Sequence, residues 1–313
     1  MAITVLNASA ENRVPIAATI GMFDGVHIGH RHILSFLKSE AGKRGLQSCV
    51  VTFPLHPQQV LAHNNATKLL MSNDDKLRQL ADCGITYAVV LPFNSRLAAT
   101  STSDFMQMLH SQFGVRMLMM GFNHHFGCNA PSNFEDYQQL GRQVGIEVLK
   151  APEYTGEYAP VSSSIIRKLI DEGDVATAAH KLGRPFKLSG VVVHGEKNGR
   201  KIGFPTANIE PEQSLLVPAG GVYAVMATLA DGRRFGAMCN IGTRPTITSS
   251  LRRSIEVNIF CFDEDIYDTI LTVDFIHRLR SECRFSSLNE LAQALAADRQ
   301  TSVTILNSLN HNI

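Results

Sequence analysis

Three histidines, His27, His30 and His32, lie close together in the stretch GMFDGVHIGHRHIL, residues 21–34. An apolar run, VPIAATI (14–20), precedes the stretch and a helical pattern follows it, so His27 and His30 are expected at the N-terminus of a helix that begins near His30. Free backbone N–H groups and the helix dipole favour phosphate at such an end. Two imidazoles three residues apart can both donate to phosphate oxygens, including charge that develops during displacement at phosphorus. The stretch therefore predicts a nucleotide phosphate site.

The histidine spacing by itself also fits two different arrangements. A metal site is one, but two histidines without a nearby third ligand leave such a site incomplete. A pair of histidines whose hydrogen bonds are satisfied within the fold is the second. Gly25 and Gly29 let the backbone approach a ligand closely, and the order strand, glycine, helix favours phosphate.

A second candidate site lies in GEKNGRKIGFPTANI, residues 195–209. Its glycines permit a tight loop whose backbone can face a phosphate. The terminal Lys–Ser/Thr pair of a Walker A loop is missing. Thr206 and Asn208 then offer hard oxygen atoms, which suit Mg²⁺ beside nucleotide phosphates. A glycine-rich turn without a ligand is the alternative. The three glycines are Gly195, Gly199 and Gly203.

Short apolar runs alternate with helical stretches in the first half of the chain. Continuous apolar runs are typical of strands buried on both faces, which predicts a parallel α/β sheet. In such a sheet ligands bind beyond the carboxyl ends of the strands, where the histidines are expected. Ser72, three residues before Asp75, and Ser101, three residues before Asp104, predict helix starts. The five runs are VPIAATI, SCVVTF, YAVVL, VRMLMM and IEVL.

After Gly183 the pattern changes to strand-like segments joined by turns. Asp231-Gly232 predicts a two-residue hairpin turn, and DEDIYD (263–268) predicts a longer one. A final amphipathic helix, SLNELAQALAADRQ, carries leucines on one face. These features predict a compact antiparallel barrel or sandwich with one helix. The leucines are Leu288, Leu291 and Leu295.

A chain of 313 residues is long for one hydrophobic core, so two domains are expected. The change of pattern places the boundary near residues 172–186. We therefore expect one domain at residues 1–183 and a second at residues 184–313.

The composition argues against several classes of partner. With 29 Lys and Arg against 28 Asp and Glu, the net charge is +1, which is too balanced for a broad nucleic-acid surface. Six widely spaced cysteines form no zinc or redox motif and are expected as free thiols in a reducing compartment. The first residues do not resemble a signal peptide, and the apolar runs are too short to span a bilayer. A cytoplasmic protein with no membrane partner is expected.

FDGVHIGH (23–30) resembles the nucleotide-binding signature of the nucleotidyltransferase superfamily. TFPLHP (52–57), LPF (91–93) and SSSIIR (162–167) are similar, in order, to the adenylyltransferase module of bacterial bifunctional riboflavin kinase/FAD synthetases. The resemblance implies a Rossmann-like nucleotidyltransferase domain that adenylylates FMN to give FAD and pyrophosphate. The ATP site that it implies comprises Gly21, Phe23, Asp24, His27, Gly29 and His30, with the two histidines as catalytic residues.

The resemblance also implies that SSSIIR is the second phosphate motif and approaches the triphosphate from the opposite side of the cleft. Hydroxyl groups and one guanidinium at a helix start can hold an anion. Helix capping is the alternative for the serines. The residues concerned are Ser162, Ser163, Ser164 and Arg167.

One motif departs from the family pattern. The family usually has a Gly-x-Asp-x-Arg-Phe-Gly-like segment near the flavin, followed by a further Arg, and this chain has GFNHHFGCNAPSN (121–133). Asn123 and His125 stand at the acidic and basic positions, before Phe126, and Ala130 replaces the later basic residue. Asparagine keeps hydrogen-bonding capacity without charge, and histidine is only partly protonated near neutral pH. The resemblance implies flavin binding here, in a weakened or altered form.

The glycine-rich stretch at 195–209 resembles the riboflavin kinase signature. GVYAV (221–225), NIGTRPT (240–246), IEVNIF (255–260) and LRSECRF (279–285) follow in the family's order. The resemblance implies a six-stranded Greek-key barrel that phosphorylates the 5′-hydroxyl of riboflavin.

Position by position, this resemblance implies that Thr206 and Asn208 hold Mg-ATP, with Mg²⁺ as cofactor and ATP as co-substrate. It implies that Glu256 accepts the hydroxyl proton, as phosphoryl transfer needs mainly alignment and charge neutralisation. Arg280 and Glu282 are implied near the flavin. From the residues alone, Glu256 also fits a solvent-facing strand residue, and surface ion pairing is the alternative for Arg280 and Glu282. Asp268 stands where a glycine is common, so this turn is expected to differ in shape.

Three hypotheses follow. The first is a bifunctional enzyme that converts riboflavin to FMN and FMN to FAD, with riboflavin, FMN, FAD and ATP as its ligands. The second keeps the kinase and makes the N-terminal module a non-catalytic flavin-binding or regulatory body, because the 121–133 segment has changed. The third is an RNA-binding protein, suggested by the HIGH string that synthetases share and disfavoured by the balanced charge.

Overall fold

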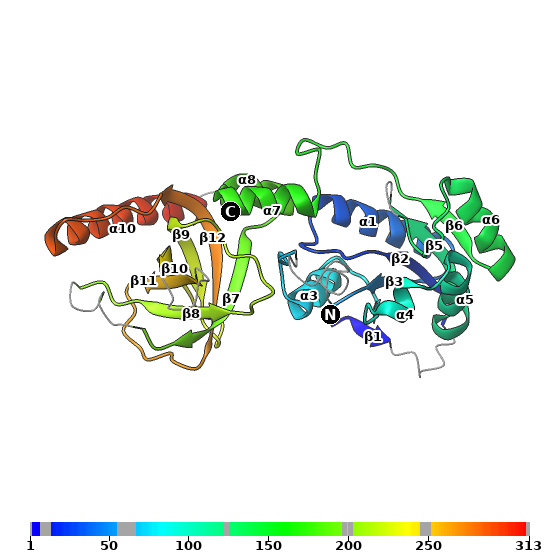
Figure 1. Cartoon of the computed structure of the whole chain (residues 1–313), viewed down its shortest axis with the longest axis horizontal. Coiled ribbons are helices and arrows are strands. Elements are labelled where there is room, and N and C mark those ends of the chain that lie inside the picture. Colours follow the sequence, from blue (N-terminus) through cyan, green and yellow to red (C-terminus); the bar gives the residue numbers. More distant parts are fainter. Residues whose placement is uncertain are drawn as a thin grey trace. The chain divides into compact units, whose positions relative to one another are not determined.

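The chain packs as two compact units, Met1–Ser162 and Ser163–Ile313, each described by itself in the computed structural model (Figure 1). The division lies earlier than the boundary expected from the sequence, because the two helices after Ser162 pack together and the second of them contacts barrel strands. The extents of the two functional domains, 1–183 and 184–313, stay a prediction. The residues that the structure describes are 2–6, 14–54, 67–121, 125–195, 199, 203–244 and 252–310.

Six parallel strands form the sheet of the first unit, in the order β1-β4-β3-β2-β5-β6. Five of them coincide with the five apolar runs, so the predicted parallel α/β fold is confirmed. β1 is not predicted by the sequence pattern, because it is short and mostly exposed at the sheet edge. The strands are β1 (Thr4–Leu6), β2 (Ile16–Ile20), β3 (Gln47–Thr52), β4 (Tyr87–Val90), β5 (Val115–Met120) and β6 (Glu147–Lys150).

Helices cover both faces of this sheet. Alternate residues of β2 belong to two separate hydrophobic clusters, one shared with α5 and α6 and the other with α1 and α3. The Ser72 and Ser101 side chains accept the backbone N–H groups of Asp75 and Asp104, which confirms the two predicted helix starts. The helices are α1 (Ile28–Lys43), α3 (Asn73–Asp82), α4 (Ser95–Ala98), α5 (Thr102–Phe113) and α6 (Phe134–Val144).

The strand order reverses between β2 and β5, which are hydrogen-bonded neighbours although β3 and β4 separate them in the chain. In an open parallel sheet, ligands bind beyond the carboxyl ends of the strands at this reversal. The segment after β2 carries His27 and His30, and the segment after β5 carries His125. Both candidate stretches of the first unit therefore begin at the carboxyl ends of neighbouring strands.

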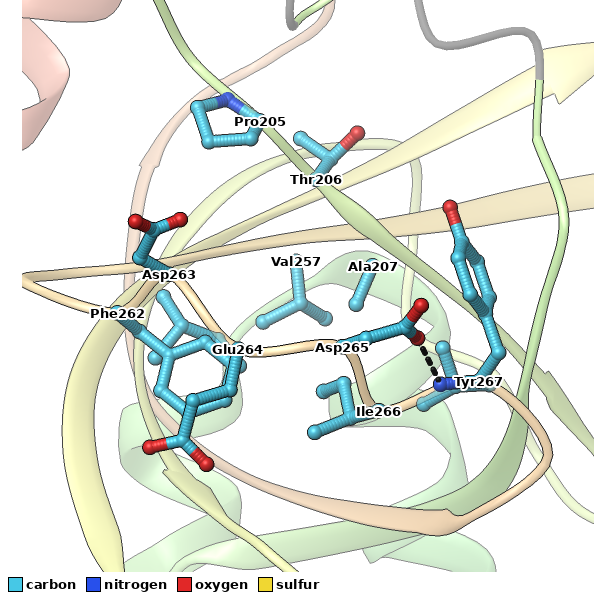
Figure 2. Close-up of a pocket in the computed structure, with 12 residues that line it drawn as sticks. Pro205, Thr206, Ala207, Val257, Phe262, Asp263, Glu264, Asp265, Ile266 and Tyr267 are labelled. Carbon is cyan, nitrogen blue, oxygen red and sulfur yellow. Dashed lines mark hydrogen bonds between the residues drawn. The ribbon is translucent and has the colours of Figure 1, made fainter.

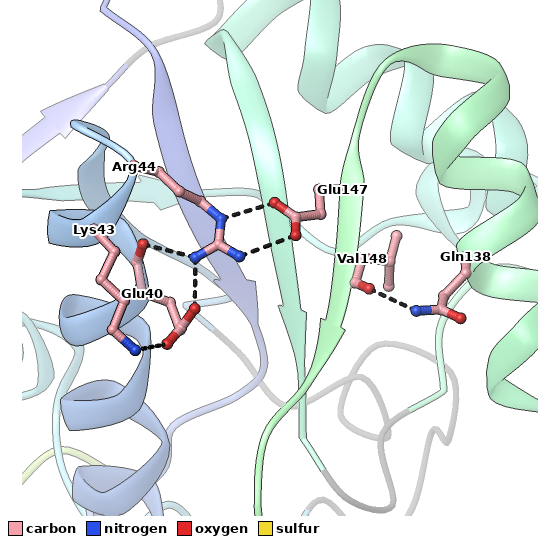
Figure 3. A network of polar contacts seen from close by, with 6 residues as sticks. All are labelled: Glu40, Lys43, Arg44, Gln138, Glu147 and Val148. Atoms are coloured by element: carbon pink, nitrogen blue, oxygen red, sulfur yellow. Dashed lines mark hydrogen bonds and ion pairs between the residues drawn. The ribbon is translucent and has the colours of Figure 1, made fainter.

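A polar network joins β6 to the end of α1 opposite the histidines (Figure 3). Arg44 donates from Nε and Nη2 to the two carboxylate oxygens of Glu147, at 2.8 and 3.0 Å, and from Nη1 to the carboxylate of Glu40. Gln138 donates to the carbonyl of Val148 at 3.2 Å, which covers part of the free edge of β6. These ion pairs lie at the surface, where water screens them, so they contribute little to stability.

Six antiparallel strands of the second unit close a barrel, in the order β10-β11-β8-β7-β12-β9. β9, β10 and β11 follow one another as neighbours, and β12 returns beside β9, which is the Greek-key arrangement. The predicted six-stranded Greek-key barrel is confirmed. The elements are α7 (Ser163–Glu172), α8 (Val175–Leu182), β7 (Phe186–Val193), β8 (Ala207–Pro211), β9 (Gly221–Thr228), β10 (Arg234–Arg244), β11 (Arg252–Ile259), β12 (Ile270–Arg280) and α10 (Leu288–Asn310).

The hairpin turn at Asp231 and Gly232 is present, but its loop is longer than the two residues predicted. The Leu229 N–H donates to the carbonyl of Arg233 at 2.9 Å, and the Gly232 N–H donates to the carbonyl of Leu229 at 3.0 Å. Residues 230–232 therefore form the loop, with Gly232 at φ 89°. A three-residue loop that ends in a left-handed glycine joins strands of this twist as well as a two-residue turn does.

The terminal helix α10 contacts the outer side of the barrel at β9, β10 and β12 (Figure 1). It begins at Leu288, inside the predicted stretch, and continues beyond that stretch to Asn310. Its Leu306 packs against Met238 and Phe260 of the barrel wall. No helix in the described part of the chain has both the length and the apolar character needed to cross a membrane.

Candidate active sites

The loop between β2 and α1 has an unusual backbone. Phe23 and Val26 have φ values of 48° and 38°, on either side of Gly25 at 82°. A positive φ is unfavourable for bulky and β-branched residues, and such strain gathers at ligand sites. Both side chains are buried, so the core holds the loop in this shape. The ring of Phe23 packs against Gly21, where an added Cβ would lie 3.1 Å from it.

His27 caps the first helix. α1 begins at Ile28, so the expected start near His30 is corrected, and His27 Nδ1 accepts the backbone N–H of His30 at 3.2 Å. The reason is that an imidazole nitrogen replaces the usual capping oxygen. His27 is 5% exposed, and its ring stacks on that of His30 with centroids 3.6 Å apart. Because His27 Nδ1 accepts a hydrogen bond from the helix backbone, His27 can donate to a phosphate only from Nε2.

His30 carries a buried ring nitrogen, Nδ1, with no hydrogen-bond partner among the described residues. Native structures rarely leave such an atom unsatisfied, so it points to a ligand. Burial, then His27 and Lys76, hold the pKa of His30 well below its usual value, so the ring is neutral. At Gly29 a Cβ would lie 2.9 Å from Cγ1 of Val161 and 3.3 Å from the His27 ring, so glycine keeps this corner open.

Asp24 and Lys76 lie buried beneath the loop, 3% and 4% exposed. Both carboxylate oxygens of Asp24 accept the N–H of Leu70, at 3.0 and 3.2 Å, which ties the loop to the chain before α3. Lys76 Nζ donates to the carbonyl of Phe53 at 2.6 Å and to that of Met22 at 3.4 Å. No sequence motif marks Lys76 as a residue of the site. Its signal is a position four residues before buried Leu80, on the core side of α3.

The structure does not offer the histidines a metal site among the residues that it describes, where no three His, Cys, Asp or Glu side chains lie close enough to hold an ion. The second phosphate motif is divided between the units. Ser162 ends the first unit, whereas Ser163, Ser164 and Arg167 begin α7 in the second. Their approach to the triphosphate stays a prediction.

The altered flavin segment is partly described. Asn123 lies outside the described residues, whereas Phe126 packs between Phe105 and Tyr137, with centroids 5.6 and 5.1 Å away. His125 lines a cavity of about 320 Å³ beyond the ends of β5 and β6, together with Lys150. The site therefore has a second basic side chain on β6, which the motif does not reveal.

One row of side chains crosses five barrel strands. Asn208 on β8 pairs with Glu256 on β11, which pairs with Asn240 on β10. The row continues through Val222 on β9 to Arg280 on β12. Side chains directly opposite on neighbouring strands point to the same face. The register thus collects predicted kinase residues from distant parts of the chain.

This row opens into a pocket of about 310 Å³ on the outer wall of the barrel, closed by residues 280–295. Five of the eight kinase residues predicted from the sequence line it, and Asn208 lies beside it in the row. Asn240 and Asn258, on the neighbouring strands β10 and β11, also line it; they lie in the matched motifs NIGTRPT and IEVNIF but were not assigned a role from the sequence. The predicted residues in its wall are Gly199, Thr206, Glu256, Arg280 and Glu282.

Each of the three predicted glycines lies where a side chain would clash or where the backbone has a positive φ. A Cβ on Gly195 would lie 2.3 Å from Nδ2 of Asn208, and one on Gly199 would lie 2.2 Å from the carbonyl of Phe204. Gly203 has φ 80°. Glycine therefore permits the loop to press against Asn208. Residues 55–57, 122–124, 196–198, 200–202 and 245–246, which belong to the matched motifs, lie outside the described residues.

A second pocket, of about 460 Å³, also has Thr206 in its wall. Figure 2 shows the rings of Phe262 and Tyr267 on opposite sides, with Val257 between them and the carboxylate of Asp265 beside Tyr267. Flat aromatic and aliphatic walls with a few polar groups suit a heterocyclic base. Thr206 is shared by the two pockets.

Asp268 closes the turn next to this pocket. It has φ 59°, and its N–H donates to the carbonyl of Val192 at 3.0 Å. Aspartate tolerates the left-handed region better than most residues, so it adopts a conformation that glycine favours. The turn was expected to differ in shape because Asp268 replaces a glycine, but Asp268 has the positive φ that a glycine there would favour.

Arg280 and Glu282 hold the pocket wall together. Arg280 Nε and Nη2 donate to the carboxylate of Asp298 on α10, and Nη1 donates to Sγ of Cys283 at 2.9 Å. The Glu282 carboxylate lies against Gly242, where an added Cβ would be 2.9 Å from Oε1. Surface ion pairing was the alternative for these residues; Arg280 does form an ion pair, at 2.7 Å, but with Asp298, whose side chain is only 9% exposed.

Two family models match the chain, FAD synthetase over residues 9–165 and riboflavin kinase over residues 182–306. The bifunctional riboflavin kinase/FMN adenylyltransferase of Bacillus subtilis is 33% identical over 96% of this chain and 95% of its own length. That of Pseudomonas fluorescens is 38% identical over 90% of each chain. A crystal structure from Streptococcus pneumoniae, described as a macrolide-efflux protein, has 28% identity and a TM-score of 0.87, covering 96% of this chain and 99% of that one.

The two matched families follow the order of the two units, and the relatives extend over nearly the whole chain. The loop with the stacked histidines falls in the first match, and the cross-strand row falls in the second. With relatives above 30% identity along at least nine-tenths of its length, the chain belongs to the bifunctional riboflavin kinase/FMN adenylyltransferase family.

Proposed function

We propose that this chain makes FAD in two steps at two separate sites. Riboflavin and ATP give FMN and ADP at the barrel, and FMN and a second ATP give FAD and pyrophosphate at the loop after β2. The observation that carries the proposal is the row Asn208–Glu256–Asn240–Val222–Arg280, which gathers the predicted kinase residues at one pocket. The unpartnered His30 Nδ1 supports the second site.

For the kinase, Thr206 is the reference point because it borders both pockets. ATP places its base in the pocket of about 460 Å³ and its γ-phosphate beside Thr206. Riboflavin fills the pocket of about 310 Å³ and directs its 5′-hydroxyl at Glu256. The hydroxyl oxygen attacks the γ-phosphorus, its proton passes to the Glu256 carboxylate, and the bond to the bridging oxygen of ADP breaks. Alignment supplies most of the rate increase.

Thr206, Asn208 and Glu256 fit a magnesium ion as ligands. A hydroxyl, an amide oxygen and a neighbouring carboxylate are hard donors, and the barrel register places Asn208 opposite Glu256. Thr206 and Asn208 are the residues that we assign to it. Held by these two residues, Mg²⁺ would neutralise charge on the ATP phosphates.

For adenylyl transfer, an FMN phosphate oxygen attacks the α-phosphorus of ATP and pyrophosphate leaves. The attacking phosphate is already ionised, so no general base is needed. His27 and His30 stabilise the developing charge by donating hydrogen bonds from a buried loop. Gly21, Phe23, Asp24 and Gly29 shape that loop, and the motif at 162–167 approaches the triphosphate. His125 and Phe126, with Asn123, bind the flavin.

We also propose that the enzyme acts in the cytoplasm, without a nucleic-acid or membrane partner. All six cysteines lie in the described residues and are free, which suits a reducing compartment.

The test is chromatography of the products from riboflavin with Mg-ATP and, separately, from FMN with Mg-ATP. FMN and FAD in the first reaction and FAD in the second are expected. FMN without FAD would remove the adenylyl-transfer half of the proposal, and no product from riboflavin would remove the kinase half.

A further inference from the structure

Lys76 lies buried beneath the nucleotide loop, although none of the steps above uses it. The residue is 4% exposed. Burying an ammonium group is costly unless it is paired and hydrogen-bonded, so its place there needs a reason. Exposed positions are available on the same helix, where the neighbouring Arg78 side chain is 72% exposed.

The ammonium of Lys76 bridges two strand ends. Nζ donates to the carbonyl of Phe53, after β3, at 2.6 Å and to the carbonyl of Met22, after β2, at 3.4 Å. The Thr52 hydroxyl donates to the same Met22 carbonyl at 3.1 Å. Two donors therefore fix the backbone immediately before Phe23, where the strained part of the loop starts.

The charges around Lys76 connect it to the histidines. Burial lowers the pKa of Lys76 to about 8, against an opposing effect of Asp24. The charge of Lys76 in turn helps to keep the pKa of His30 low and its ring neutral. The charged or titratable groups on the elements packed around Lys76 are Asp24, His27, His30 and Arg31, with Asp75 and Arg78 paired on α3 itself.

We propose that Lys76 is a positioning residue for adenylyl transfer, whose protonated amine holds the Met22 and Phe53 carbonyls and thereby keeps the His27–His30 loop in the shape that receives ATP. The inference rests on the proposed function of this loop. A neutral amine has one hydrogen fewer and no charge, so it holds two carbonyls less firmly. The ammonium is present below its pKa and is lost above it. FAD formation therefore falls as the pH rises through about 8.

The experiment measures kcat/KM for FMN adenylylation from about pH 6.5 to 9.5 in the full-length protein and in the variants Lys76→Arg and Lys76→Met. The wild type is expected to lose about tenfold per pH unit at the alkaline end. Lys76→Arg keeps a charged donor over this range and is expected to be less active but free of the alkaline loss. Lys76→Met is expected to be at least about tenfold less active than the wild type below pH 8 and to show no alkaline loss of its own.

Two controls separate positioning from folding. Riboflavin phosphorylation by the same samples reports the barrel and is expected to be unchanged by the Lys76 variants. Lys38→Met is the matched variant, because Lys38 Nζ also donates to a backbone carbonyl, that of Cys83 at the C-terminal end of α3, at 2.8 Å, but from an exposed position on α1. It is expected to leave both activities unchanged.

Unchanged adenylylation in Lys76→Met would overturn the proposal, as would an alkaline loss in Lys76→Arg equal to that of the wild type. The second result decides the matter even if Lys76→Met does not fold. A wild type that makes no FAD at any pH would instead overturn the proposed function of the loop.

Discussion

Arg280 and Asp298 join the last barrel strand to the terminal helix through three hydrogen bonds. Arg280 Nε donates to both carboxylate oxygens of Asp298 at 3.1 Å, and Nη2 donates to Oδ2 at 2.7 Å. The bond to Asp298 raises the pKa of Arg280, so the guanidinium stays charged. Because residues 280–295 close the pocket proposed for riboflavin, this pair holds one wall of that pocket in place.

Asp298→Ala should therefore weaken riboflavin binding. Asp298 is 7% exposed, and its loss leaves Arg280 without a carboxylate, at a cost of about 1.5–3 kcal/mol to the second unit. We expect the KM for riboflavin to rise several-fold, with FMN adenylylation unchanged. Steady-state kinetics and thermal unfolding measure the two effects. The control is Glu147→Ala, which removes an exposed bidentate partner of Arg44 and should change stability little. An unchanged riboflavin KM in Asp298→Ala would show that the pair does not shape the pocket.

Glu256→Gln should stop riboflavin phosphorylation while preserving the shape of the pocket. The amide has nearly the same volume but cannot accept the hydroxyl proton, so we expect kcat to fall by about 10²- to 10⁴-fold with little change in KM. FMN adenylylation in the same sample should stay at the wild-type rate. Glu210→Gln is the control, because Glu210 is an exposed carboxylate on β8 outside the row. Phosphorylation by Glu256→Gln at the parent rate would make the assignment of Glu256 wrong.

Whether a strand or a helix start can be predicted from the sequence depends on whether burial or capping leaves a pattern of residue types. The runs that become β2 to β6 are apolar because both faces of the sheet are covered, so a simple pattern finds them. β1 has no such pattern, since its side chains are mostly exposed. α1 starts earlier than predicted because a histidine nitrogen caps it, a role that composition rules give to other residues.

The candidate sites contain some residues that sequence motifs reveal and others that they do not. Thr206, Asn208 and Glu256 belong to motifs, and the barrel register brings the last two opposite each other. Lys76 and Asp298 depend on which face of a helix turns inward and on what that face meets across the fold. Those contacts join residues far apart in the chain, and no local pattern records them.

His27 has two separable roles, and substitution by different residues should distinguish them. His27→Ala loses both the cap of α1 and the proposed donor to phosphate, whereas His27→Asn restores a capping oxygen but lacks the imidazole. We expect both variants to reduce kcat/KM for FAD formation by about 10²- to 10³-fold. Only His27→Ala should also lose about 0.5–2 kcal/mol of stability in the first unit. His30→Ala should reduce FAD formation without loss of the cap's side chain. Equal loss of riboflavin phosphorylation in these variants would contradict two separate sites.

Substitutions of Asp268 test the backbone conformation of its turn through stability, without involving either catalytic reaction. Its φ of 59° favours glycine, whereas a β-branched side chain is strongly disfavoured there. We expect the melting temperature of the second unit to increase in the order Asp268→Val, Asp268→Ala, wild type, Asp268→Gly. The step from wild type to glycine should be worth about 1 kcal/mol or less, because the left-handed conformation costs an ordinary residue about 1–2 kcal/mol and glycine has the more flexible unfolded chain. Calorimetry of the four proteins measures the order. A valine variant as stable as the glycine variant would mean that the turn does not adopt a left-handed conformation at this residue.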